Sequence, residues 1–266
     1  MKINNMKILI VGFGDVGSAL HKIIKVSGIC GKSGLQIFDP FIDFHPMDKE
    51  FDIMHICIPH NDKFVRNFLT ITESFRSKVV IIESTIPIDC FDNVELKENM
   101  EKSSLWIYSP VRGTHPNIVT GLKHFVKFGA PIFLTQWISF NVFVVNYYRS
   151  IDIPFKPCSD YKALILGKIL STTWYGMLIA FCNMTNKICT DNKISFRESY
   201  NNWMSTDEIG ENYIKGNKNG RASAIKNIKR PVMTPGKIGG HCVMPNLEMI
   251  KEYMPEFYLW IKKFSK

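Results

Sequence analysis

Residues 6 to 17 read MKILIVGFGDVG, an apolar run followed directly by a glycine-rich turn. The run from Met6 to Val11 has the length and composition of a strand that is buried on both faces of a sheet. After the turn, apolar residues recur at helical spacing until Gly28, at Ala19, Leu20, Ile23 and Ile24. This stretch therefore predicts a strand, a tight turn and a helix, in that order.

The turn matches the pattern G-x-G-x-x-G, with Gly12, Phe13, Gly14, Asp15, Val16 and Gly17. In a dinucleotide-binding turn the first glycine permits the bend, the second lets a pyrophosphate approach the backbone, and the third lets helix and strand pack closely. The N-terminus of the helix then faces the anion. A strand before the pattern and a helix after it are the context that dinucleotide binding requires, although a tight turn without a ligand is the alternative.

An acidic residue stands where such a site needs one. Asp39 follows Gly17 by 22 residues, at the end of the next predicted strand, Leu35 to Phe38. A carboxylate there can accept hydrogen bonds from both ribose hydroxyls and repel a 2′-phosphate. The sequence therefore predicts a dinucleotide cofactor and favours NAD over NADP.

The rest of the first 157 residues alternates between apolar runs and helical patterns. We expect strands at 52 to 58, 79 to 82, 105 to 108, 124 to 128 and 151 to 155, and helices at 64 to 75, 94 to 102 and 136 to 148. After Pro157 the apolar spacing becomes that of one long helix, from about 159 to 190. The predicted fold is α/β, a Rossmann-type, doubly wound parallel sheet in an NAD-binding domain at 1–157, followed by a helical second domain at 158–266.

Composition limits the class of protein further. Of the 266 residues, 45% are apolar and 21% charged, which excludes disorder and coiled coil, and the net charge of +9 favours an anionic ligand. The seven cysteines are widely spaced and never form C-x-x-C, so a reducing cytosol fits better than a disulfide framework or a zinc ribbon. We expect no signal peptide, no metal site and a cytoplasmic location. The apolar stretch 161–181 contains two lysines, and we interpret it as a buried helix and not as a membrane span.

Two residues of the second half are candidates for catalysis. Cys242 lies in the glycine-rich segment 236–242 beside a basic stretch, which suits a nucleophilic thiolate, but a small buried cysteine would fit the same segment. Lys168 stands on an otherwise apolar helix, where it could stabilise an oxyanion or extend to solvent. Thr172 and Tyr175 follow on the same face of that helix.

Three further residues are candidates for substrate contacts. Arg112 and His115 follow the strand that ends at Tyr108, and ligands bind beyond the carboxyl ends of parallel strands. His241 precedes the candidate nucleophile, although capping a turn is an alternative. The basic stretch 215–237 fits a solvated face, a site for a phosphorylated small molecule or, without a recognised module, a nucleic-acid surface.

Taken in order, these motifs resemble the nucleotide-sugar 6-dehydrogenases, the UDP-glucose/GDP-mannose dehydrogenase family of polysaccharide biosynthesis. The resemblance runs through nearly the whole chain. It rests on the cofactor turn 11–17, the Glu-Ser-Thr-Ile-Pro segment 83–87, the segment 109–117, the helix from Gly167-Lys168 to Asn183, and Gly-Gly-His-Cys at 239–242.

The resemblance implies two hydride transfers to NAD, the second through a cysteine thiohemiacetal and thioester. Cys242 would be the nucleophile and Lys168 the group that stabilises the oxyanion, while Ser84 and Thr85 would lie against the cofactor. Three positions depart from the family pattern, and the family continues into a C-terminal nucleotide-binding domain where this sequence ends. Val111 replaces a glutamate. The resemblance also places Thr172 and Asn246 among the catalytic residues, in place of an asparagine and an aspartate, so we expect altered chemistry or a smaller substrate.

The sequence therefore predicts an NAD-dependent dehydrogenase that acts on a sugar-nucleotide or sugar-phosphate alcohol or aldehyde. Two alternatives remain: a 3-hydroxyacid dehydrogenase that depends on Lys168, and a catalytically idle NAD-binding or scaffold protein. We expect a homodimer joined through the long apolar helix, as the resemblance implies, with no nucleic-acid or membrane partner.

Overall fold

The computed structural model describes residues 5–100, 104–113, 117–204, 233–238 and 240–265 of the chain, without the side chains of residues 32 and 240–242. The chain divides into two compact units, Met1–Lys168 and Ile169–Lys266. The first unit contains the whole sheet, and the second is helical in its described part.

Seven strands of the described chain form one sheet in the order β2-β1-β3-β4-β5-β6-β7. They are β1 Met6–Val11, β2 Cys30–Phe38, β3 Glu50–Ile56, β4 Arg76–Ile82, β5 Leu105–Tyr108, β6 Lys127–Pro131 and β7 Phe155–Pro157. The first five pair in parallel, and the chain passes from β1 to β2 on one side and to β3 on the other. This reversal of direction beside β1 is the switch point at which Rossmann-type sheets bind ligands.

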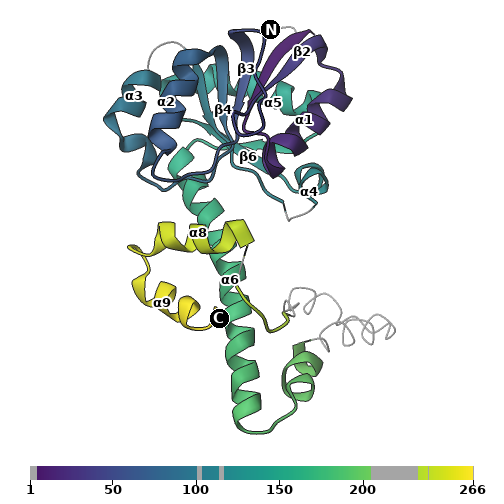
Figure 1. Ribbon diagram of the computed structural model, residues 1–266, viewed down its shortest axis with the longest axis vertical. Helices are drawn as coiled ribbons and strands as arrows, with labels where there is room; N and C mark the ends of the chain where they lie inside the picture. The colour runs from purple at the N-terminus through teal and green to yellow at the C-terminus, as the bar shows by residue number, and fades with distance from the viewer. Residues whose placement is uncertain (1–4, 101–103, 114–116, 205–232, 239, 266) are drawn as a thin grey trace, which may run out of the picture. The chain divides into compact units, whose positions relative to one another are not determined.

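Helices cover both faces of the sheet, which confirms the predicted doubly wound α/β fold (Figure 1). One face packs against α1 Asp15–Ser27, α4 Ile118–His124 and α5 Trp137–Ser150 around a single apolar cluster. α2 Phe64–Ser74 and α3 Val94–Met100 contact each other on the other side. The central strand β1 explains the arrangement, because Ile8, Leu9 and Ile10 are fully buried and only a sheet covered on both faces can bury consecutive residues.

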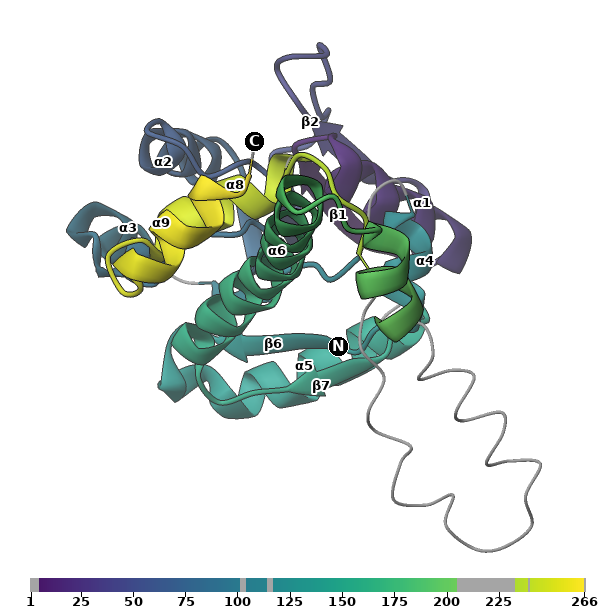
Figure 2. The same cartoon turned by 90° about the horizontal axis from the view of Figure 1, so that it is seen from below.

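One strand direction differs from the prediction of a wholly parallel sheet. β6 pairs antiparallel with β5, and β7 runs parallel to β6. Figure 2 shows β6 and β7 together with α5. An antiparallel neighbour needs no crossover over the sheet, and among the described residues between β5 and β6 the one helix is the seven-residue α4. Hydrophobic patterns give the existence of a strand and not its direction.

The last two strands begin later than predicted. α4 continues through His124, and Phe125 ends it by donating its N–H to the Gly121 carbonyl, so β6 begins at Lys127. Before β7, Asp152 adopts a positive φ of 56° within a turn, so the strand begins only at Phe155. Both strands are short, and their ends are set by the preceding turns.

The helix α6 Tyr161–Asp191 runs through the end of the first unit into the second. In the second unit, α8 Gly240–Ile250 and α9 Pro255–Lys263 follow a π-helical turn, η3 Arg197–Asn201. A Cβ on Gly176 of α6 would lie 2.6 Å from the Val243 side chain, so α8 packs closely on this helix. In the described part of the chain, α6 is the helix whose length and composition would suffice to cross a membrane. Only 28% of its apolar 18-residue window is buried within the chain, so the prediction of a buried helix is wrong for the chain as described.

Candidate functional site

The glycine turn between β1 and α1 has the geometry of a phosphate-binding loop. Gly12 has a φ of +85°, and a Cβ there would lie 2.8 Å from the Cys57 carbonyl oxygen. A Cβ on Gly17 would collide with the Gly12 carbonyl oxygen, so this glycine is needed for close packing of helix and strand. A Cβ on Gly14, by contrast, would meet no described atom within 4 Å.

These differences separate the roles of the three glycines. Gly12 and Gly17 are required by the protein's own packing. At Gly14 the protein imposes no such requirement, while α1 begins at the next residue with its first N–H groups beside the turn. A glycine facing open space at a helix N-terminus fits the close approach of a pyrophosphate.

Asp39 is fixed beside this turn by two backbone hydrogen bonds. Its Oδ2 accepts from the N–H of Phe13 at 2.7 Å, and its Oδ1 accepts from the N–H of Phe41 at 3.0 Å. The carboxylate is therefore oriented before any ligand binds, and each oxygen retains capacity for a further hydrogen bond. The structure brings together the two parts of the sequence that predicted a dinucleotide site, and their residues fit the pyrophosphate and ribose of such a cofactor.

Ser84 and Thr85 follow β4, on the opposite side of β1 from Asp39. Ser84 is buried, and its hydroxyl donates to the Ile58 carbonyl at 2.6 Å. This bond ties the loop after β4 to the loop after β3. Thr85 is half-buried, so it is the more accessible of the two predicted cofactor contacts.

Arg112 follows β5 and is exposed, with its guanidinium 5.5 Å from the centre of the Phe125 ring and 5.9 Å from that of Phe128. These contacts hold the cation against the domain. His115 lies outside the described residues. Val111, at the position of the family's glutamate, is buried in the apolar core and has no proton to exchange.

The second unit joins two of the predicted catalytic positions directly. Asn246 is buried in α8, and its Nδ2 donates to the Thr172 hydroxyl of α6 at 2.9 Å. Asn183 also anchors the segment before α8, because its side chain bonds to the N–H and the carbonyl of Gly236, each at 2.7 Å. Both contacts fix α8 relative to α6 within this unit.

Cys242 is the third residue of α8, but its side chain and that of His241 lie outside the described part of the structure. Lys168 is half-buried on α6, at the last position of the first unit. Residues 215–232 of the basic stretch also lie outside the described residues. Within the described ranges, no group of three or more His, Cys, Asp or Glu side chains is placed to hold a metal ion.

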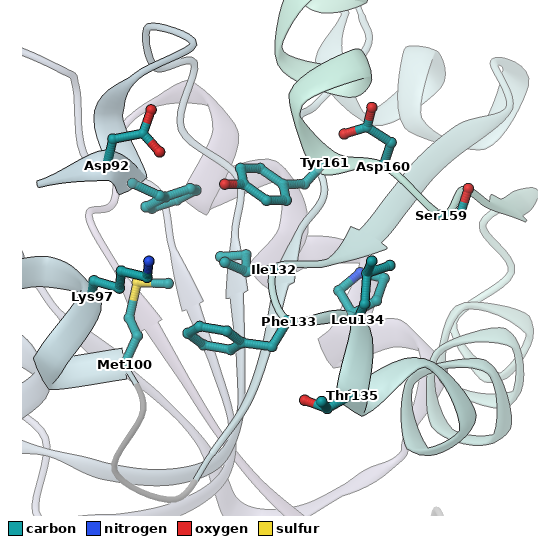
Figure 3. A pocket seen from close by; sticks show the side chains of 12 residues that line it. Asp92, Lys97, Met100, Ile132, Phe133, Leu134, Thr135, Ser159, Asp160 and Tyr161 are labelled. Atoms are coloured by element: carbon teal, nitrogen blue, oxygen red, sulfur yellow. The ribbon is translucent and has the colours of Figure 1, made fainter.

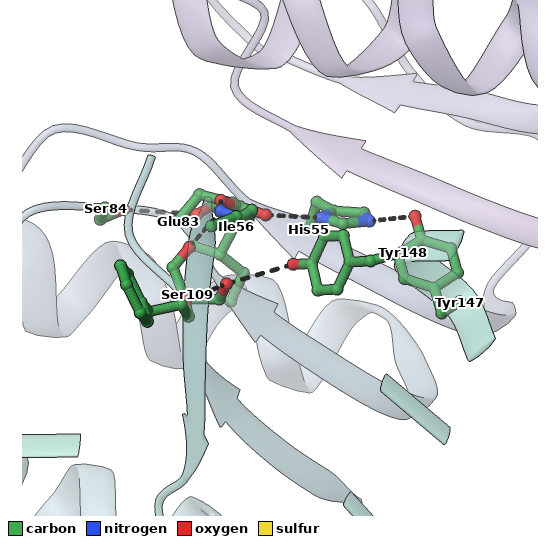
Figure 4. Close-up of polar contacts among 9 residues, drawn as sticks. His55, Ile56, Glu83, Ser84, Ser109, Tyr147 and Tyr148 are labelled. Carbon is green, nitrogen blue, oxygen red and sulfur yellow. Dashed lines mark hydrogen bonds and ion pairs between the residues drawn. The ribbon is translucent and has the colours of Figure 1, made fainter. Parts of the chain in front are cut away.

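A buried polar cluster that the sequence analysis missed lies beneath the carboxyl ends of β3, β4 and β5 (Figure 4). Glu83 contacts the His55 ring at 3.0 Å and the Lys127 ammonium at 2.5 Å, and all three side chains are at most 1% exposed. Burial alone would raise the pKa of Glu83, but the charge of Lys127 and the hydrogen bond from His55 outweigh it, so the pKa is lowered. Glu83 is therefore an anion paired with a buried lysine.

A separate pocket of about 740 Å³ lies in the first unit between α3, the loop after β6 and the start of α6 (Figure 3). Its lining is mainly apolar and aromatic, with Phe91, Phe133 and Tyr161, and Lys97 is among the charged side chains around it. None of its lining residues is a predicted site residue.

No protein-family model matches the sequence, and no curated protein matches it. Solved structures do match. The UDP-D-ManNAc dehydrogenase of Pyrococcus horikoshii is 15% identical with a TM-score of 0.71, and the match covers 98% of this chain and 68% of that one. For the UDP-N-acetyl-mannosamine dehydrogenase of Staphylococcus aureus the identity is 16%, the TM-score 0.67, and the coverage 97% and 67%.

A shorter enzyme also matches. The 3-hydroxyisobutyrate dehydrogenase of Mycobacterium tuberculosis is 13% identical with a TM-score of 0.62, over 98% of this chain and 91% of that one. This chain thus spans about two thirds of the length of the two UDP-sugar enzymes but nearly the whole length of the hydroxyacid enzyme. The resemblance stated from the sequence is confirmed at the level of the fold: over nearly its whole length, the chain has the fold of the UDP-sugar dehydrogenases.

Proposed function

We propose that this protein is an NAD-dependent dehydrogenase that oxidises an alcohol or aldehyde of a sugar nucleotide or sugar phosphate. The observation that supports it best is the contact between Asp39 and the glycine turn. The Asp39 carboxylate accepts from the N–H of Phe13 at 2.7 Å, where it would bind the ribose of a dinucleotide whose pyrophosphate the turn at Gly14 would hold.

Different residues near the switch point would bind the adenosine half and the nicotinamide half of the cofactor. Asp39 would accept hydrogen bonds from the adenosine ribose, and the first N–H groups of α1 would bind the pyrophosphate. Thr85, which follows β4 and is half-buried, would contact the nicotinamide half. When bound, NAD accepts a hydride from the substrate carbon.

Cys242 is the proposed nucleophile. Its thiolate adds to the carbon of an aldehyde, so that the carbonyl π bond breaks and the oxygen becomes an alkoxide, which the Lys168 ammonium stabilises. Loss of a hydride from that carbon leaves a thioester on Cys242, and water releases the carboxylate and restores the thiol.

The Thr172–Asn246 pair affects the hydrolysis of the thioester by water. Neither an amide nor an aliphatic hydroxyl is a useful base at neutral pH, so these positions hold the site together and do not activate water. We expect thioester hydrolysis to be the slow step.

A second candidate is supported by the length of the match to the 3-hydroxyisobutyrate dehydrogenase. Oxidation of the alcohol of a 3-hydroxyacid to an aldehyde or ketone needs no thiol, because a single hydride leaves and no thioester forms. Lys168 would then be essential and Cys242 dispensable.

The purified protein should be mixed with NAD and a panel of sugar nucleotides, sugar phosphates and 3-hydroxyacids, and the absorbance of reduced nicotinamide followed. Turnover of a sugar derivative that depends on both Cys242 and Lys168 supports the first proposal. Turnover of a hydroxyacid that survives Cys242→Ser supports the second. Binding of NAD without turnover of any compound would leave a cofactor-binding protein.

A further inference from the structure

The buried cluster joins three of the strand ends from which the candidate site is built. His55 lies in β3, one residue before its end, and Glu83 follows β4 directly. Lys127, the first residue of β6, donates to Glu83 Oε2 at 2.5 Å and to the Ser109 carbonyl, just after β5, at 2.6 Å. One ammonium group therefore links the end of β4 to the end of β5.

The residues that follow these contacts are the predicted ligand contacts. Ser84 and Thr85 come directly after Glu83, and Arg112 is three residues after Ser109. The Ser109 hydroxyl also donates to the Phe128 carbonyl at 2.8 Å and accepts from the Tyr148 hydroxyl at 3.2 Å. The start of each loop is thus held by several buried hydrogen bonds that meet at β6 and α5.

The negative charge of Glu83 determines that His55 donates the hydrogen bond between them. Because Glu83 is ionised, its contact with His55 Nδ1 requires a proton on that nitrogen. The Tyr147 hydroxyl lies 2.6 Å from His55 Nε2, and burial, the main cause, raises the pKa of Tyr147. Polar contacts thus connect Tyr147 to His55 and His55 to Glu83, and Lys127 connects Glu83 to Ser109.

A buried ion pair is weak evidence for stability, because replacing it with apolar residues of similar size often leaves the fold equally stable. Its specific effect is geometric, because an ammonium that contacts two acceptors at these distances sets their separation. We propose that Lys127 is a positioning residue, which fixes the loops after β4 and β5 for the nicotinamide half of the cofactor and leaves the adenosine half at β1 and β2 unaffected. This inference rests on the proposed function for the identity of the ligand, but not for the effect on the loops.

The test compares the double variant Glu83→Gln/Lys127→Met with the natural protein. Removing both charges avoids an unpaired buried carboxylate, and the amide carbonyl of the introduced glutamine can still accept the hydrogen bond from His55. Lys123→Met is the matched control, since it breaks an exposed lysine–carboxylate pair, with Asp152 at 2.9 Å, in the helix before β6.

The first measurement is amide hydrogen exchange without ligand. In the double variant we expect exchange to be faster by about tenfold in the segments 84–88 and 109–113 and unchanged in 11–17, as for a local loss of order. The control should exchange like the natural protein in all three segments. Unchanged exchange in 84–88 and 109–113, or equal acceleration in 11–17, would overturn the proposal.

The second measurement is calorimetric binding of ADP and of NADH, since ADP lacks the nicotinamide half. We expect the double variant to bind ADP within about twofold of the natural protein and NADH about tenfold more weakly. An equal loss of affinity for ADP and NADH would show that Lys127 has a general structural role and does not position these loops. If the natural protein binds neither ligand, the proposed function fails, and the exchange measurement still decides the role of Lys127.

Discussion

The Nδ2 of Asn246 and the hydroxyl of Thr172 lie 2.9 Å apart, although the two residues are 74 positions apart in the sequence. They occupy the positions at which the nucleotide-sugar 6-dehydrogenases, by the resemblance of the motifs, carry an aspartate and an asparagine. Neither side chain is charged, and this hydrogen bond joins them. It therefore provides a structural contact between α6 and α8 where a carboxylate would provide a base.

This pairing predicts the kinetics of the thioester. With an aldehyde substrate, we expect a burst of reduced cofactor close to one per site, followed by slow turnover, because no base at 172 or 246 activates water. Stopped-flow absorbance measures it. The variant Asn246→Asp should shorten the slow phase by about tenfold if the restored carboxylate acts as a general base. A linear time course without a burst would contradict slow release.

Cys242→Ser should abolish aldehyde oxidation, by about a thousandfold or more, because a serine hydroxyl without an activating base is a much weaker nucleophile than a thiolate. Affinity for NAD should be unchanged. Cys158→Ser, at a half-buried cysteine after β7, is the control and should retain activity. If Cys242→Ser turns over at the rate of the natural protein, the reaction does not proceed through a covalent cysteine intermediate, and the hydroxyacid reaction is favoured.

Two glycines of the turn should respond differently to alanine. Gly17→Ala places a methyl group against the Gly12 carbonyl and should destabilise the fold by about 2 kcal/mol, measured by denaturant unfolding. Gly14→Ala meets no described atom within 4 Å, so its stability should be close to natural while NAD affinity falls about tenfold or more. Gly167→Ala, in α6, is the control for a helix position with open space. Equal affinity for NAD in Gly14→Ala and the natural protein would contradict the cofactor site.

Acid should destabilise the protein partly through Glu83. The pKa of this carboxyl is lowered in the folded state from an ordinary value of 4.5, so its contribution to stability is complete above that pH and is lost as the pH falls through the folded-state pKa. Thermal unfolding midpoints should therefore decrease less steeply below about pH 4.5 in Glu83→Gln/Lys127→Met than in the natural protein. The other carboxylates with lowered pKa values remain in both proteins, and parallel pH profiles would rule out this contribution.

The start of the fold was predictable because its signals are local. β1 has the predicted bounds, and α1 ends at Ser27, with Gly28 capping it at a φ of 69°. A glycine in this left-handed region can be recognised from the sequence alone. The antiparallel direction of β6 was not predictable, because it depends on where the chain packs and not on any residue within the strand.

The candidate site was predictable only where its residues lie close together in the sequence. The turn and Asp39 follow a spacing rule, and the structure brings them within hydrogen-bond distance. His55, Glu83 and Lys127 come from three strands, and each lies in or beside an apolar run where a polar residue gives no periodic signal. A buried lysine becomes informative only once the carboxylate beside it is known.

The exposed apolar side chains of α6 bear on the oligomeric state that the sequence suggests. Trp174, Tyr175 and Ile188 are each about half exposed. As the resemblance of the motifs implies, we expect a homodimer through α6, to be measured by light scattering at micromolar concentration. Trp174→Glu should weaken it, and a monomeric natural protein would contradict it.

A calorimetric titration of the natural protein with NAD and with NADP tests directly whether Asp39 and the glycine turn form an NAD site. Asp39, held by the N–H of Phe13, should accept from the ribose hydroxyls and repel a 2′-phosphate, so NAD should bind at least about tenfold more tightly than NADP. In Asp39→Asn this preference should largely disappear, while Asp43→Asn, in the same loop, should retain it. Equal affinities for NAD and NADP in the natural protein, or no binding of either, would contradict the assignment of the site.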